Sequence, residues 1–374
     1  MLKYILLFIR KGKLMKNNHN LLMKMKNLEK FSGAIKRCVA IAMASMLFAT
    51  TGFSLDTHPV KAQEVSSSAD KIEIPEISKD AFKKYKKISG IGANTILGAD
   101  FTYYQQCLEW GKSYKNYMSQ SVDNIFDYVK SQGINTISLK VAVNPTGENA
   151  YLSLENAIKT LKAVKASNTN LKTNLVLLYS DEITYAGTQN LPADWEKAEK
   201  EEQSVTRVES AKTYTRETIA KLKQAKVLPD IVTIGNEVNW NFLGITDGEG
   251  WEGWKAMGDI SALLKKEGVK NAVSIAAQPD AASVKYIVQK LGYASVDYDY
   301  IGVNVYPDNN TNSYIKSLKN EVESCAPDKQ LIVSNVEYER VNEANTANVY
   351  TQADSIYNLL EATIDEKNGV HPVK

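Results

Sequence analysis

The run Ile231-Val-Thr-Ile-Gly-Asn-Glu237 decides the fold of this chain. Its first four residues are apolar or β-branched, which is typical of a short buried strand. The strand ends in a glycine followed by two polar residues, the second of them a glutamate. A carboxylate at the carboxyl end of a buried parallel strand is where a (β/α)8 barrel carries its chemistry. For this glutamate taken alone, a surface position at the end of a strand is the alternative.

A second run of the same kind follows one hundred residues later. Leu331-Ile-Val-Ser-Asn-Val-Glu337 is again an apolar strand that ends in a glutamate. A retaining glycosidase needs two carboxyl groups about 5–5.5 Å apart, one protonated and one ionised. The pair Glu237 and Glu337 therefore predicts a catalytic site, although each residue alone also fits a strand end at the surface.

Strands and amphipathic helices alternate along the chain from about residue 90. The predicted strands lie near residues 96–101, 136–143, 175–179, 231–237, 272–277, 299–306 and 331–337. The helix after the first strand is expected to begin at a cap on Ser121 and to end at Gly133. This alternation predicts an α/β fold with a parallel sheet, and at this length a (β/α)8 TIM barrel. Only seven strand–helix units are found, so we expect the domain of residues 90–374 to be incomplete at its C-terminal end, because an open barrel exposes unpaired strand edges.

Composition excludes several classes of function. The chain has 374 residues and a net charge of +2, so it carries no basic excess of the kind that binds nucleic acid. Its three cysteines and three histidines lack metal-ligand spacing, so neither a metal site nor a disulfide framework is predicted. Two distant cysteines in the body, Cys107 and Cys325, are expected to be free thiols rather than a disulfide. No cofactor is predicted.

The first part of the chain is typical of an export leader. A basic stretch ends at Lys36-Arg37, an apolar run covers residues 39–48, and Val60-Lys-Ala62 places small residues where a signal peptidase cuts. Residues 1–62 are therefore predicted to be a signal peptide, with an uncleaved membrane anchor as the alternative. The polar residues 63–89 follow as a linker or arm. We expect a secreted protein without membrane attachment after cleavage.

Further segments carry a family likeness. They are Gly98-Ala-Asp-Phe101, the stretch 179–195 with its Tyr-Ser-Asp and Pro-Ala-Asp-Trp motifs, the run 229–237, and 301–307 with its Ile-Gly and Tyr-Pro pairs. From about Gly98 to its end the chain resembles glycoside hydrolase family 53, the endo-β-1,4-galactanases that cut arabinogalactan. The resemblance implies a plant-type polysaccharide substrate and a monomeric enzyme. Calcium occurs in the family, but no residue pattern here predicts it.

The resemblance also assigns roles to individual residues. Glu237 would be the general acid/base and Glu337 the nucleophile, and Asn236 would bind the sugar 2-hydroxyl. Tyr306 would donate a hydrogen bond to Glu337, although a core tyrosine with a satisfied hydroxyl fits equally well. The remaining predicted substrate-binding residues are Asp181, Asp100 and Trp240. For Asp181 the alternative is a loop-capping aspartate, and for Trp240 it is packing in the core.

The chain departs from the family pattern around the expected cleavage point. Ser138, Lys140 and Ala142 stand where the family has the pattern R-x-R-x-W. Leu178 replaces a histidine and Ile183 a tryptophan. Two alternatives follow: a catalytically impaired glycan-binding barrel, or a related retaining β-glucanase or mannanase. The presence of both glutamates favours an enzyme.

Overall fold

The computed structural model describes residues 85, 88, 91, 95–116, 120–201, 206–246, 251–276, 281–305, 311–336 and 346–364. These residues all belong to one compact unit, 72–374, which is described here by itself. The predicted signal peptide and nearly all of the predicted arm lie outside the described residues, as do Tyr306 and Glu337. None of the helices in the described ranges is long and apolar enough to cross a membrane.

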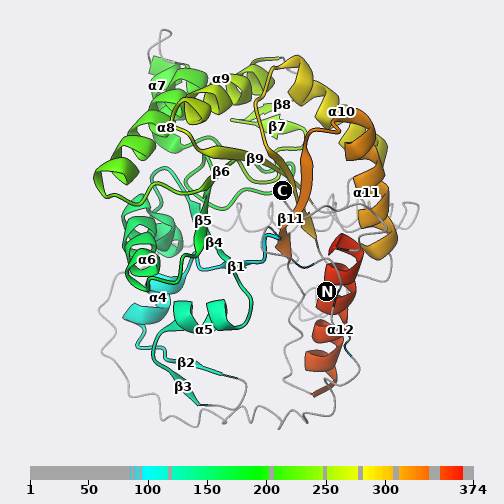
Figure 1. The fold of residues 1–374 in the computed structure, drawn as a ribbon. Helices are drawn as coiled ribbons and strands as arrows, with labels where there is room; N and C mark the ends of the chain where they lie inside the picture. The colour runs from blue at the N-terminus through cyan, green and yellow to red at the C-terminus, as the bar shows by residue number, and fades with distance from the viewer. Residues whose placement is uncertain are drawn as a thin grey trace, which may run out of the picture. The chain divides into compact units, whose positions relative to one another are not determined.

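Seven parallel strands form one sheet, and they are adjacent in the order in which they occur along the chain. The strands are β1 (Gly98–Asp100), β4 (Thr136–Val141), β5 (Lys172–Leu177), β6 (Ile231–Ile234), β9 (Lys270–Ile275), β10 (Tyr300–Val305) and β11 (Gln330–Val336). Figure 1 shows that the sheet curls, with helices along its outer side. Sequential strands that pair in parallel need a crossover between them, and the helices supply it. The expectation of a (β/α)8-type barrel with seven strands is confirmed.

The connecting helices pack against one another around the outside of the sheet (Figure 1). They are α4 (Tyr104–Glu109), α5 (Ile125–Ser131), η3 (Gly147–Leu152), α6 (Leu154–Ala166), α7 (Ala193–Glu201), α8 (Arg207–Gln224), α9 (Glu252–Lys266), α10 (Ala281–Tyr293), α11 (Thr311–Cys325) and α12 (Thr346–Ile364). Two antiparallel hairpins decorate the connections, β2 (Tyr114–Lys115) with β3 (Ser121–Val122) and β7 (Asn241–Phe242) with β8 (Ile245–Thr246).

Polar side chains cap the N-termini of several helices. The Ser153 hydroxyl accepts from the Asn156 N–H at the start of α6, and the Thr206 hydroxyl accepts from the Glu209 N–H at the start of α8. The prediction of Ser121 as the cap of α5 is wrong. Asn124 caps this helix by accepting from the N–H groups of its first turn, because Ser121 is paired in the β2–β3 hairpin.

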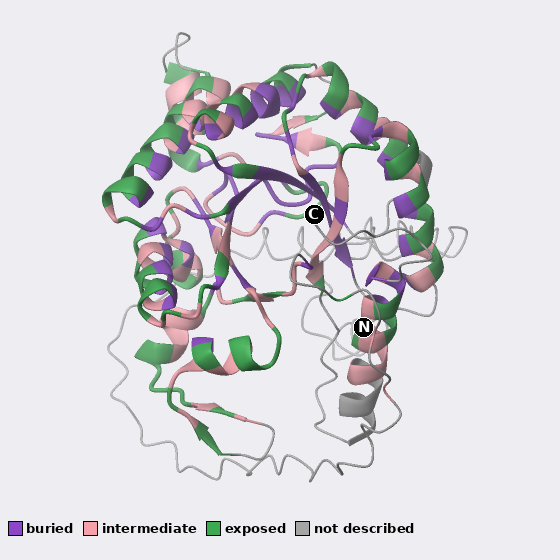
Figure 2. Ribbon diagram, in the orientation of Figure 1, coloured by how far each residue is buried: buried purple, intermediate pink, exposed green. Residues whose placement is uncertain are grey.

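The central strands β6, β9 and β10 are buried on both faces, as Figure 2 shows. The outer face packs against the helices through residues such as Val232 and Ile234. The inner face forms a separate small cluster of Ile231, Ala272 and Tyr300, to which only strand residues and Ile96 contribute. Because alternate residues of a strand point to opposite faces, all four residues of β6 are buried. Cys107 and Cys325 are free thiols, as expected.

Candidate active site

The chain turns sharply where β6 ends. Gly235 has φ +70°, and a Cβ at this position would overlap the side chain of Val238, so no larger residue fits. Glu237 also lies in the left-handed region, with φ +56°, which is unfavourable for a residue with a Cβ. The turn brings Asn236 and Glu237 into the barrel mouth as buried side chains, 4% and 5% exposed.

The Glu237 carboxylate accepts one hydrogen bond at each oxygen. Asn304 Nδ2 donates to Oε1 at 2.9 Å, and the backbone N–H of Ala186 donates to Oε2 at 2.9 Å. Asn304 lies on β10, whereas Ala186 lies on the loop that follows β5. A buried carboxylate is stable only when its oxygens find donors, and here one donor comes from a strand and one from a loop.

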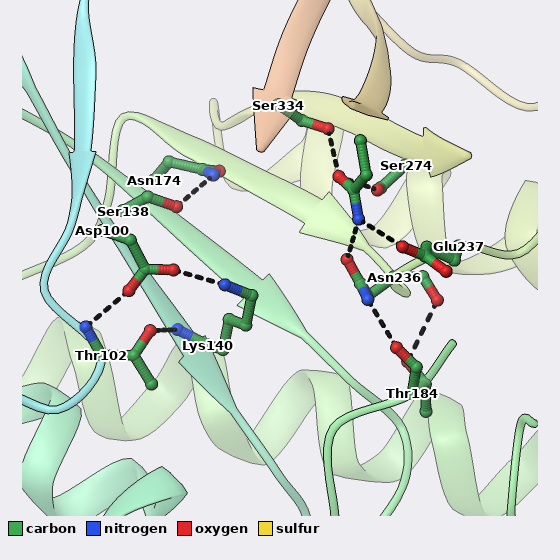
Figure 3. A network of polar contacts seen from close by, with 11 residues as sticks. Asp100, Thr102, Ser138, Lys140, Asn174, Thr184, Asn236, Glu237, Ser274 and Ser334 are labelled. Carbon is green, nitrogen blue, oxygen red and sulfur yellow. Dashed lines mark hydrogen bonds and ion pairs between the residues drawn. The ribbon is translucent and has the colours of Figure 1, made fainter. Parts of the chain in front are cut away.

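Asn304 on β10 connects β9, β11 and the turn after β6 at the mouth. Its Nδ2 also donates to Asn236 Oδ1 at 3.1 Å, and its Oδ1 accepts from Ser334 Oγ at 2.8 Å and from Ser274 Oγ at 3.4 Å. Figure 3 shows Ser274 and Ser334 converging on the same network as Asn236 and Glu237. The sequence analysis did not single out Asn304. Its place two residues before Tyr306, within the predicted strand 299–306, was the signal that would have put both residues on one face of that strand.

A β-bulge brings Ser334 into this network. The register between β10 and β11 shifts after Val303, so that Asn304 pairs with Asn335 and Ser334 is the extra residue. Gly302 makes room for it, because a Cβ on Gly302 would lie 2.8 Å from Ser334 Cβ. The bulge therefore aims a hydroxyl at Asn304 that regular pairing would not supply.

The loop after β5 is fastened to the turn after β6. The Thr184 hydroxyl donates to the Asn236 carbonyl at 3.0 Å, and Asn236 Nδ2 donates to the Thr184 carbonyl at 2.6 Å. The buried Gln189 side chain donates to the carbonyls of Asn236 and Glu237 at 2.9 and 3.2 Å. Between these anchors, Tyr185 and Thr188 pair across a tight turn whose tip includes Ala186. The loop thus holds the N–H of Ala186 against the carboxylate.

Asp100 and Lys140 form an ion pair on the other side of the mouth (Figure 3). The second carboxylate oxygen of Asp100 accepts from the Thr102 N–H at 2.8 Å, and the Thr102 hydroxyl accepts from the Lys140 N–H at 3.0 Å. The half-exposed Tyr103 lies nearby. Partial burial raises the pKa of its hydroxyl, and the Lys140 ammonium offsets part of this rise. The ion pair is a polar group that a substrate hydroxyl can approach.

The positions that depart from the family pattern gather at the ends of β4 and β5. Ala142 and Leu178 are buried together with Leu152 and Val176, and Ile183 packs against them. We call these five residues the β4–β5 apolar cluster. Ser138 lies deeper, where its hydroxyl accepts from Asn174 Nδ2 at 3.0 Å and Asn174 Oδ1 accepts from the Thr233 hydroxyl at 2.9 Å.

The remaining predicted residues lie in different settings. Asp181 accepts from the backbone N–H groups of Asn144 and Ala193, each at 3.0 Å, which is the loop-capping alternative; its role in substrate binding stays a prediction. Trp240 is 41% exposed on the connection after β6, with its ring 5.9 Å from that of Tyr286, so it is not a core residue. In the ranges that the structure describes, no three His, Cys, Asp or Glu side chains gather as metal ligands.

A curled parallel sheet with outer helices defines a barrel of the (β/α)8 type, and the buried carboxylate lies at a strand end, where such barrels carry their chemistry. The family model of glycosyl hydrolase family 53 matches residues 96–369. The chain belongs to this family.

Relatives and solved structures agree with this assignment. The chain is 29% identical over 232 residues to an arabinogalactan endo-β-1,4-galactanase of Cellvibrio japonicus, covering 59% of each chain. It is 28% identical over 253 residues to one of Thermothelomyces thermophilus, covering 63% of this chain and 70% of that one. The chain thus spans about 59% of the length of the Cellvibrio relative.

Two solved structures share the fold. The Ignisphaera aggregans GH53 catalytic domain superposes with a TM-score of 0.65 at 20% identity, covering 77% of this chain and 85% of that one. A fungal β-1,4-galactanase superposes with a TM-score of 0.61 at 20% identity, covering 75% and 88%.

Proposed function

We propose that this protein is a secreted retaining endo-glycosidase that hydrolyses β-1,4-galactan, with Glu237 as general acid/base and Glu337 as nucleophile. The observation that carries the proposal is the buried Glu237 carboxylate, held by Asn304 and Ala186 at the mouth of a family 53 barrel. A buried, positioned carboxyl at a strand end is what proton transfer to a glycosidic oxygen requires.

The second carboxyl of the proposal follows the last described residue of β11. The described pairing of β10 with β11 ends at Val305 and Val336, and Tyr306 and Glu337 are the next residues in the sequence. In the proposed reaction the Glu337 carboxylate attacks the anomeric carbon while Glu237 protonates the departing oxygen. Glu237 then removes a proton from water, which displaces Glu337 and restores the original configuration.

The substrate of the proposal is a plant-type polysaccharide, cut by a monomer outside the cell. The support is that both curated relatives described above carry the name arabinogalactan endo-β-1,4-galactanase. The Asp100–Lys140 pair and the exposed Trp240 supply polar and aromatic groups, which are the two kinds of contact that sugars use.

A glycan-binding barrel without turnover is the second candidate. The observation in its favour is the β4–β5 apolar cluster, whose side chains offer no hydrogen bond to a sugar hydroxyl. A related β-glucanase or mannanase would combine the same two glutamates with another specificity. Assays of the purified protein on galactan, glucan and mannan oligosaccharides separate these candidates.

Substitution of each glutamate tests the proposed mechanism. Glu337→Ala is expected to lower turnover by several orders of magnitude and to abolish the glycosyl-enzyme, because covalent catalysis has no local substitute. Glu237→Ala is expected to accumulate a glycosyl-enzyme from an aryl glycoside with a good leaving group, since that first step needs little acid. Added azide should then restore part of the rate as a β-glycosyl azide. A wild-type protein that binds galactan without turnover, with both variants binding equally well, would support the binding barrel instead.

A further inference from the structure

We propose that Asn304 is a positioning residue that orients the Glu237 carboxyl group for proton transfer by donating a hydrogen bond to Oε1. The inference rests on the proposed function, because it specifies how Glu237 acts as an acid. It depends on the direction of five hydrogen bonds made by the Asn236 and Asn304 side chains, each of which can be deduced from its neighbour.

The Thr184 backbone carbonyl sets the first direction. A carbonyl oxygen can only accept, so the atom of the Asn236 side chain that lies 2.6 Å from it must be the amide nitrogen. The other end of the Asn236 amide, Oδ1, therefore faces Asn304. The orientation of the Asn236 amide is thus fixed by the backbone of a neighbouring loop, whatever the protonation state of Glu237.

The orientation of the Asn236 amide also fixes which end of the Asn304 amide faces the Glu237 carboxyl group. Because Asn236 Oδ1 is an acceptor, the Asn304 atom 3.1 Å away must be Nδ2, and the same nitrogen lies 2.9 Å from Glu237 Oε1. The Oδ1 end of Asn304 points to the hydroxyls of Ser334 and Ser274, which can donate to it. Reversing the Asn304 amide would place two oxygens against each other at Asn236.

The consequence concerns the orientation of the Glu237 carboxyl group. Because the Asn304 amide can only donate to Oε1, this hydrogen bond is kept in both protonation states of Glu237. The Ala186 N–H holds Oε2 in the same way. Each oxygen has a second lone-pair direction, so the two donors fix the plane of the carboxyl group and leave room for the proton that goes to the leaving group.

The inner face of the barrel offers a matched control for Asn304. Asn174 on β5 is also an inward-facing asparagine that links two neighbouring strands, through Ser138 and Thr233. No hydrogen bond in the described network joins it to Glu237. Replacing either asparagine by leucine removes a hydrogen-bonded amide from the inner face, whereas only the Asn304 variant removes a donor to the carboxyl.

The first measurement compares two leaving groups. We expect Asn304→Leu to lower kcat/KM on a galactan oligosaccharide by about 100-fold, the lower end of what a positioned acid contributes, and to lower it far less on a dinitrophenyl galactobioside. Asn174→Leu should change both values by the same factor. Asn304→Ser serves if the leucine variant does not fold. Equal losses on both substrates for the Asn304 variants would overturn the inference.

The second measurement does not depend on turnover. The side-chain NH2 signals of Asn304, identified by their absence in Asn304→Ser, should shift in the NMR spectrum of Glu237→Ala. Glu182→Ala is the control, because Glu182 accepts from Asn190 Nδ2 on the adjacent loop and should move only the Asn190 signals. If the wild type cleaves neither substrate, the proposed function fails, but this spectrum still shows whether Asn304 is hydrogen-bonded to Glu237. Asn304 signals that stay in place in Glu237→Ala would overturn the inference.

Discussion

The two halves of the barrel mouth differ in chemistry although the same kind of strand end builds both. At the ends of β6, β9, β10 and β11, buried amides and hydroxyls surround the Glu237 carboxylate and satisfy one another. At the ends of β4 and β5, the β4–β5 apolar cluster fills the corresponding space with side chains that need no partner. Position at the mouth therefore does not by itself give a residue a chemical role. The role depends on whether neighbouring strands supply complementary polar atoms.

The largest expected effect comes from making the apolar half polar. Leu178→Asn should lower the free energy of unfolding by about 4 kcal/mol, because it removes a fully buried apolar side chain and leaves an amide without partners. Urea-induced unfolding measures the change. Ile183→Asn, at the half-buried edge of the same cluster, should cost less than half as much. Equal costs for the two variants would show that the cluster is open to water.

In the polar half, an added side-chain atom is expected to cost more stability than the loss of a hydrogen-bonding amide. Gly235→Ala should cost about 3 kcal/mol, since its Cβ would overlap Val238 and its φ of +70° is left-handed. Gly187→Ala isolates the backbone contribution. Its φ is +82° with no atom within 4 Å of the added Cβ, and it should cost about 1 kcal/mol. Thermal unfolding measures both costs. Equal costs for Gly235→Ala and Gly187→Ala would mean that the Val238 side chain moves aside without loss of stability.

Substitutions in the loop after β5, which joins the two halves, are expected to have a smaller effect on stability. Gln189→Leu should cost about 2 kcal/mol, because its Nε2 donates to the carbonyls of Tyr185, Asn236 and Glu237, which then lose a donor. Asn190→Ala, on the exposed side of the same loop, should change stability by less than about 0.5 kcal/mol. Chemical unfolding compares the two, and similar losses would remove Gln189 as the anchor of this loop.

The smallest expected effect on stability concerns Glu199 on α7 and Arg207 on α8, and it depends on pH. Hydrogen bonds from Arg207 hold the pKa of Glu199 below its ordinary value of 4.5, against the opposing effect of partial burial. A lowered folded-state pKa means that the contribution is present above about pH 4.5 and is lost as the pH falls through the lower folded value.

Glu199→Gln should therefore cost about 0.5 kcal/mol near pH 7, and the gap from wild type should close under acid conditions. Thermal unfolding at a series of pH values measures the gap. Glu196→Gln is the control, because Glu196 is exposed and its ion pair with Lys200 is exposed too, and it should give no measurable change. A gap for Glu199→Gln that widens toward low pH would contradict the assignment.

Several features of this protein were predictable from the sequence. The alternation of apolar strands and amphipathic helices predicted the parallel sheet and the seven strands. The composition of the run from Ile231 to Glu237 placed a glutamate at the end of a fully buried strand. These predictions succeeded because strand and helix periodicities are local and are written in consecutive residues.

Only the tertiary structure decided what surrounds that glutamate. Asn304 lies 67 residues from Glu237 along the chain, and the bulge that brings Ser334 to it depends on the register between two strands. The capping role of Asp181 and the gathering of Ala142, Leu178 and Ile183 likewise depend on which loops and strands meet at the mouth. A sequence specifies which residues can form hydrogen bonds. Which of them become partners follows from the strand order and register that bring distant residues together.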